Sequence, residues 1–196
     1  MNLKKLIKGL ALVLGLFVLF TLSFTFEELQ KEFEDIIDYD VPLIEQETDK
    51  CCWAASILMV LNYNTQESRY SQEEIAGKVG LTLKDVAVKE FQKVIDYWEF
   101  YTYPTACFLP EAWYDLLKEK GPLIITVYLG GEYTHTVVLK GMSNRIGNPT
   151  MYINDPLEEY EVAILYSEFE KEYESAGWDN PDDFTLIAYY SPLEEQ

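Results

Sequence analysis

The hydrophobic pattern of this chain changes its period at Gly121, and that change limits the folds open to it. Before Gly121, apolar residues recur at helical spacing; after it, short segments rich in β-branched and aromatic residues alternate with turns. The predicted helices are 52–62, 71–80, 84–98 and 110–120, and the predicted strands are 123–129, 133–142, 150–154, 161–166 and 184–190. A helical N-terminal half followed by a mostly antiparallel sheet predicts an α+β fold.

Local signals mark several helix ends. Ser71 and Glu74 have the spacing of a capping box at the start of the second helix, which we expect to stop at Gly80. Gly121 closes the fourth helix. In the first helix, apolar residues cover most of the surface, which predicts a central, buried helix. These residues are Trp53, Ile57, Leu58, Val60 and Leu61.

The N-terminus has the pattern of an export signal. Lys4, Lys5 and Lys8 precede a long uncharged run, residues 9–26. This run is longer than the usual signal-peptide core of about 7–15 residues and shorter than a membrane span of about 20. We therefore expect residues 1–26 to be a signal peptide or a membrane anchor, and either one would export the rest of the chain. We expect residues 27–40 to be an acidic helical spacer and 41–196 to be the folded domain.

The composition is strongly acidic, with 34 Asp and Glu against 15 Lys and Arg and a net charge of −19. Binding to nucleic acid is not expected, because the chain has no basic stripe that would displace counterions from a phosphate backbone. The charge is explained by solubility and self-repulsion, or alternatively by a preference for basic peptide substrates.

Three cysteines are present: Cys51, Cys52 and Cys107. In an exported protein an odd number leaves at least one thiol free. Cys51 and Cys107 could pair and leave Cys52 reduced, or the cysteines could be small buried apolar residues. One histidine and adjacent cysteines make a poor metal site, so no metal is expected.

Cys52 and the single histidine, His135, are a candidate nucleophile and its base. A thiol attacks a carbonyl only as the thiolate, and the first turn of a helix favours that ionised form. Cys52 begins the first predicted helix. His135 lies in a predicted strand flanked by glycines, although a lone histidine on an apolar strand is often a core residue. Any imidazole chemistry must use His135, because there is no other imidazole.

Two further polar groups complete a candidate site. Gln46, in a predicted loop before Cys52, has the side-chain amide that an oxyanion site requires. Asn154 and Asp155, at the end of a predicted strand, are candidates for the group that orients the histidine ring. A loop glutamine can equally be solvated surface, and Asp-Pro at a strand end can be an ordinary turn.

These residues follow one another as Gln46-x5-Cys52-Trp53-Ala54-x-Ser56, then His135, then Asn154-Asp155-Pro156. This order and spacing resemble the papain-like cysteine peptidase superfamily. The chain is most similar to its branch of bacteriocin-leader-processing peptidases and plant-pathogen effector proteases. Three flanking segments resemble that branch as well, namely 41–44, 71–76 and 121–124.

The resemblance implies a cysteine peptidase that acts on peptides or proteins without a cofactor. It implies Cys52 as nucleophile, His135 as general acid and base, Asp155 as orienting group and Gln46 as oxyanion donor. Papain itself uses an asparagine as orienting group, so Asn154 is the alternative to Asp155. The same residues would also serve a transglutaminase or an amidase, and an inactive, surface-tethered binding module is a further alternative.

Overall fold

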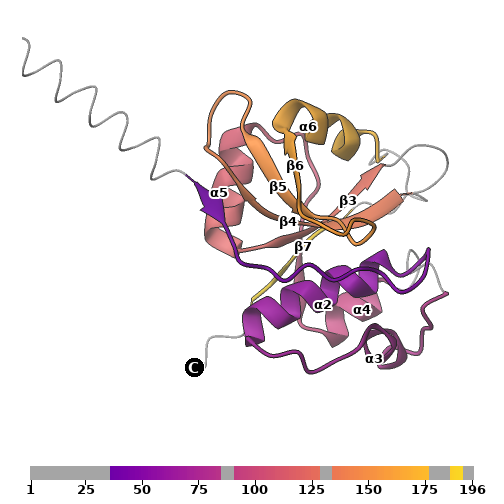
Figure 1. Ribbon diagram of the computed structural model, residues 1–196. Helices are drawn as coiled ribbons and strands as arrows, with labels where there is room; N and C mark the ends of the chain where they lie inside the picture. Colours follow the sequence, from indigo (N-terminus) through magenta and orange to yellow (C-terminus); the bar gives the residue numbers. More distant parts are fainter. Residues whose placement is uncertain (1–35, 85–90, 129–133, 177–185, 192–196) are drawn as a thin grey trace, which may run out of the picture. The chain divides into compact units, whose positions relative to one another are not determined.

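A computed structural model describes residues 36–84, 91–128, 134–176 and 186–191. Within these ranges there are five helices: α2 (Cys52–Thr65), α3 (Gln72–Gly77), α4 (Phe91–Tyr97), α5 (Pro110–Lys120) and α6 (Tyr166–Glu174). The strands are β1 (Ile37–Asp38), β2 (Phe100–Tyr103), β3 (Leu123–Tyr128), β4 (Thr134–Met142), β5 (Thr150–Asn154), β6 (Val162–Leu165) and β7 (Ile187–Tyr190). Figure 1 shows these elements.

The strands form one seven-stranded sheet in the order β2-β7-β3-β4-β5-β6, and β1 pairs with β4. Every pairing between the described strands is antiparallel. The α+β prediction is therefore confirmed, with two strands before Gly121 and one helix, α6, within the strand-rich half.

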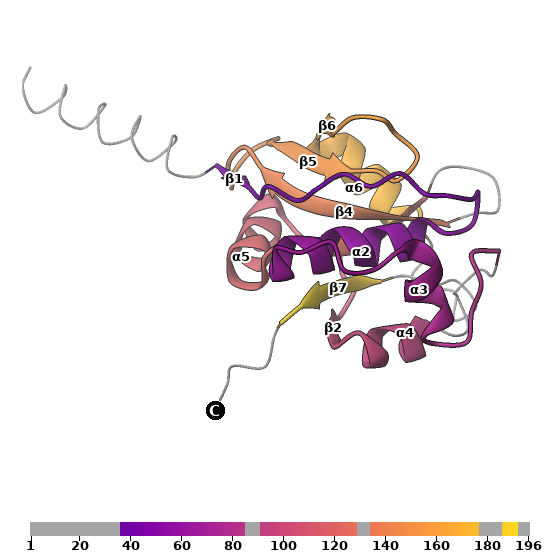
Figure 2. The same cartoon turned by 60° about the horizontal axis from the view of Figure 1, so that its bottom comes forward.

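Helices cover both faces of the sheet, and successive strand residues alternate between two hydrophobic cores. Ile124 packs with α2, α3 and α4, whereas its neighbours Leu123 and Ile125 pack with α5 and α6. Val138 in β4 and Ala188 in β7 lie on the α2 side as well. Figure 2 shows α2 running along the sheet, next to α3 and α4.

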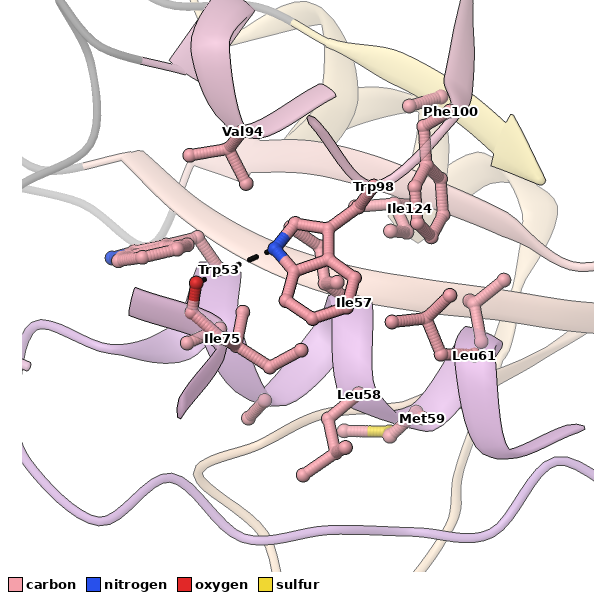
Figure 3. Packing of buried hydrophobic residues seen from close by; sticks show 14 of the residues in the cluster. Trp53, Ile57, Leu58, Met59, Leu61, Ile75, Val94, Trp98, Phe100 and Ile124 are labelled. Carbon is pink, nitrogen blue, oxygen red and sulfur yellow. Dashed lines mark hydrogen bonds between the residues drawn. The ribbon is translucent and has the colours of Figure 1, made fainter. Parts of the chain in front are cut away.

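Helix α2 is the centre of the first core. Its residues from Trp53 to Leu61 are all buried, as the sequence predicted. Figure 3 shows Trp53 and Ile57 of this helix in the same cluster as Ile75 of α3, Val94 of α4 and the tryptophan that follows α4, Trp98. The Trp98 indole N–H donates a hydrogen bond to the Ile75 carbonyl at 3.3 Å.

Most predicted elements match the described ones within a few residues. The Ser71–Glu74 capping box is present, and α5 has the predicted bounds. Helix α3 ends at Gly77, before the predicted stop at Gly80, because the amide of Leu81 already turns back to the carbonyl of Ala76. The predicted helix 84–98 is described only as α4, since residues 85–90 lie outside the described ranges.

Two elements were missed by the sequence analysis, although each carries a local signal. Residues 100–103 form the edge strand β2 and consist mostly of aromatic side chains. Tyr166, predicted to end a strand, instead begins α6. In α6 the buried side chains Tyr166, Phe169 and Tyr173 have helical spacing, which predicts an amphipathic helix.

The prediction of a helical spacer over residues 27–40 is wrong for its described part. Ile37 and Asp38 form β1 and pair with Met142 and Gly141. The approach is very close: a Cβ at Gly141 would lie 2.1 Å from the carbonyl oxygen of Ile37. Residues 27–35, like the predicted signal segment 1–26, lie outside the described ranges. Among the described residues, no helix has the length and apolar character needed to cross a membrane.

Candidate active site

Cys52 is the first residue of α2, where backbone N–H groups have no acceptor within the helix. Its side chain is partly exposed, whereas that of Cys51 is fully buried. The two neighbours therefore differ in access. Only Cys52 combines the helix start with contact to solvent.

His135 and Asp155 are brought together by the pairing of β4 with β5. The His135 Nε2 atom lies 2.6 Å from Asp155 Oδ1. The same carboxylate oxygen accepts the backbone N–H of Leu157 at 2.8 Å, which holds the carboxylate in place. Both side chains are largely shielded from water, with 6% and 17% of their surfaces exposed. With Nε2 bound to Asp155, the other ring nitrogen is left for Cys52.

Asn154 has a different environment from its neighbour. Its side-chain amide donates a 2.9 Å hydrogen bond to the carbonyl of Val41, and the residue is 1% exposed. The two side chains diverge, as expected for successive residues at a strand end. Asn154 thus joins β5 to the segment before α2, while Asp155 contacts the histidine.

The electrostatics of the site favour a thiolate and an imidazolium. Burial acts to raise the Cys52 pKa, but a hydrogen bond and the positive charge of His135 outweigh it, and the pKa is lowered. For His135, burial acts to lower the pKa, yet Asp155 and Cys52 raise it to about 9. Both shifts act in the direction of a thiolate–imidazolium ion pair.

Thr136 is a site residue that the sequence analysis did not identify. Its backbone N–H and its hydroxyl both act to lower the pKa of the Cys52 thiol. Its carbonyl accepts a 3.1 Å hydrogen bond from the buried hydroxyl of Ser56, which fastens α2 to β4. The signal in the sequence was its position directly after the only histidine.

Gln46 lies in the segment before α2, next to the turn that follows Asp155. Its backbone N–H donates to the carbonyl of Pro156 at 2.9 Å. Its side-chain Nε2 donates to the carbonyl of Thr48 at 2.7 Å, so one amide hydrogen is held within its own loop. Its Oε1 is buried and accepts no hydrogen bond from the described residues. The structure thus brings the Gln46 loop to the Asp155 turn.

The suggested Cys51–Cys107 disulfide is absent, because all three cysteines are free. Cys51 is buried and Cys107 is exposed. The Cys51 sulfur accepts the backbone N–H of Thr48 at 3.1 Å and lies 3.2 Å from Gln72 Oε1. Cys51 is thus part of the loop that precedes the candidate nucleophile.

The family model described as papain-like cysteine protease AvrRpt2 matches residues 35–174. The chain belongs to this family. It is a papain-like cysteine peptidase, a hydrolase that acts on peptide or protein substrates, and the resemblance to the effector-protease branch is confirmed. The matched range begins just before β1 and ends with α6, so it contains Gln46, Cys52, His135 and Asp155. A search of curated proteins found no match.

Proposed function

We propose that this peptidase cleaves peptide bonds with a Cys52–His135–Asp155 triad and a thioester acyl-enzyme. The observation that carries the proposal is the 2.6 Å contact between His135 and Asp155, next to a thiol whose pKa the same histidine lowers. The three members of the triad have separate roles. Cys52 attacks, His135 moves protons, and Asp155 holds the imidazole ring and stabilises its positive charge.

In the acylation step, the Cys52 thiolate adds to the carbonyl carbon of the scissile peptide bond. The tetrahedral oxyanion collapses as His135 gives its proton to the leaving amine, and a thioester remains on Cys52. In the second step, His135 takes a proton from water, and the resulting hydroxide attacks the thioester. This attack forms a second tetrahedral intermediate. Its collapse releases the carboxylic acid product and restores the Cys52 thiolate and the His135 imidazolium.

The oxyanion needs hydrogen-bond donors at both steps. We assign this role to the backbone N–H of Cys52 and to the Gln46 side chain. The Cys52 N–H is at the first position of α2, where no helix carbonyl can accept it. The Gln46 Nε2 carries two hydrogens, of which one binds Thr48, so the second is available to a substrate.

Incubation of the purified full-length protein with a peptide library, followed by mass analysis, tests the activity. Products that gain one water per cleavage are expected from wild type and not from Cys52→Ala, with Cys107→Ala as the control that stays active. Products joined to an added amine would indicate a transglutaminase. Release of ammonia with intact chains would indicate an amidase. No product at all, with no selective alkylation of Cys52, would indicate an inactive binding module.

We also propose that the domain acts outside the cytoplasmic membrane, as the lysines and the uncharged run 9–26 suggest. Protease added to intact cells should digest an anchored domain, and spent medium should contain a cleaved one. Full-length soluble protein in the cytosol would contradict both forms of the proposal.

A further inference from the structure

Gln72 is a buried polar residue in the capping-box segment that no step of the proposed mechanism uses. It is 2% exposed, and its amide reaches away from α3 to the loop before α2. Its Nε2 donates to the carbonyl of Glu45 at 2.6 Å, and its Oε1 accepts the N–H of Glu47 at 3.1 Å. One side chain thus binds the backbone on both sides of Gln46.

The same amide also reaches the residue before the nucleophile. The Cys51 thiol donates to Gln72 Oε1 at 3.2 Å, and the Cys51 sulfur accepts the N–H of Thr48. The carbonyl of Thr48 in turn accepts the Gln46 side-chain amide. Gln72 is therefore joined to the two ends of the segment that links the oxyanion donor to the nucleophile.

We propose that Gln72 is a positioning residue that holds the Gln46 side chain in place relative to Cys52. This inference rests on the proposed function. An amide suits this role, because the loop presents one carbonyl and one N–H, and a carboxamide has both a donor and an acceptor to satisfy them.

The anchor at the other end of Gln72 is rigid. Helix α3 starts with a complete capping box, in which Ser71 Oγ accepts the Glu74 N–H at 3.2 Å and Glu74 accepts the Ser71 N–H at 2.8 Å. Ile75 and Ala76 of α3 are fully buried in the core that surrounds α2. The loop is thereby tied to the same core that carries Cys52.

A second tie holds the loop from the opposite side, since the Gln46 N–H binds the carbonyl of Pro156. Loss of Gln72 would remove the hydrogen bonds at Glu45 and Glu47 and leave the loop held by Pro156 and by the Thr48 hydroxyl, which donates to the Leu83 carbonyl at 2.5 Å. Glu45 and Glu47 are exposed, so water can replace the lost hydrogen bonds at little cost in folding. A displacement near 1 Å at a reacting group can lower the rate by about 10²-fold.

A kinetic comparison of Gln72→Met with the matched control Gln92→Met tests the inference. Gln92 is an exposed residue of α4, and its side-chain amide donates to Asp96 of the same helix. We expect Gln72→Met to lower kcat about 10–100-fold with little change in KM. The pH profile of Cys52 alkylation should stay as in wild type, because the His135 ion pair is untouched. A kcat within twofold of wild type, or an equal loss of alkylation, would overturn the proposal.

A double-mutant cycle shows whether Gln72 acts through Gln46. The Gln46→Ala/Gln72→Met variant should lose no more activity than Gln46→Ala alone, whereas losses that multiply would contradict the inference. Hydrogen exchange of residues 45–51 supplies a readout that needs no activity. Exchange should be faster in Gln72→Met and unchanged in Gln92→Met. Unchanged exchange in both variants overturns the inference, even if no peptide is cleaved. Faster exchange in Gln72→Met without any peptide cleavage counts only against the proposed function.

Discussion

His135 and Asp155 lie twenty residues apart in the chain, yet Nε2 of one is 2.6 Å from Oδ1 of the other. The antiparallel pairing of β4 with β5 produces this contact. Asp155 contributes to raising the His135 pKa to about 9, and the charged imidazole in turn lowers the pKa of Cys52. The Asp155 carboxylate thereby influences the ionisation of Cys52 through the imidazole ring between them.

The choice between the two adjacent cysteines is tested by separate alanine variants. Cys52→Ala should lower kcat by about 10⁴-fold or more, as expected for loss of a nucleophile. Cys51→Ala removes the thiol contacts to Thr48 and Gln72 and a little core packing, and should lose no more than about tenfold, or ~1.4 kcal/mol of transition-state free energy. Steady-state kinetics with a cleaved peptide would measure both. An inactive Cys51→Ala beside an active Cys52→Ala would move the nucleophile by one residue.

The pH dependence of Cys52 alkylation should depend on Asp155. The reactive ion pair is present above the lowered pKa of Cys52 and is lost as pH rises through the His135 pKa of about 9. Asp155→Asn removes a charge that raises the histidine pKa, so the alkaline limit of alkylation should move to lower pH. Alkylation rates with iodoacetate, whose negative charge is attracted by the imidazolium, measured from acid to alkaline pH across both limits, would show the shift.

Asn154→Ala is the companion variant, and its effect should be on stability. The change leaves the buried carbonyl of Val41 without its donor, which should lower the free energy of unfolding by about 1–3 kcal/mol. Urea unfolding would measure the loss, and the pH limits of alkylation should not move. A shifted pH profile in Asn154→Ala together with a normal profile in Asp155→Asn would assign the orienting role to Asn154.

Gln46→Ala should lower kcat by about 10²–10³-fold, because one oxyanion donor is lost. The loop keeps its backbone hydrogen bond to Pro156, so the unfolding midpoint should change little. Peptide kinetics and thermal unfolding would separate the two effects. A variant with wild-type kcat would remove Gln46 from the site.

Thr136→Val should make Cys52 harder to ionise. The substitution keeps the size of the side chain and the backbone N–H but removes the hydroxyl, one of the groups that lower the thiol pKa. The acid limit of alkylation should therefore move to higher pH, while the alkaline limit set by His135 should stay in place. An unchanged acid limit would show that the hydroxyl does not stabilise the thiolate.

A glycine substitution in β4 tests the packing of β1, and a glycine substitution in α3 is its control. Gly141→Ala places a methyl group against the Ile37 backbone, which must move, and should destabilise the fold by about 1–3 kcal/mol. Gly77→Ala, in α3, has nothing within 4 Å of the new methyl and should stabilise the helix by about 0.5–1 kcal/mol. Unfolding curves of the two variants should shift in opposite directions.

Local patterns in the sequence were sufficient for several elements. The start and burial of α2 follow from its apolar residues, and the beginning of α3 follows from Ser71 and Glu74. These features depend on residues within one or two turns of each other, so their physical causes can be read along the chain. The order of the candidate site residues along the chain, Cys52 and His135 among them, likewise indicated the family that the family model then showed.

Contacts between distant residues decided the rest. Whether Asn154 or Asp155 faces His135 depends on the pairing of β4 with β5. Ile37 is a strand residue because Gly141 has no side chain to keep it away. Only the fold brings Gln72 to the loop that precedes Cys52. A hydrogen bond across a fold is set by where whole elements pack, and no local sequence pattern contains that information.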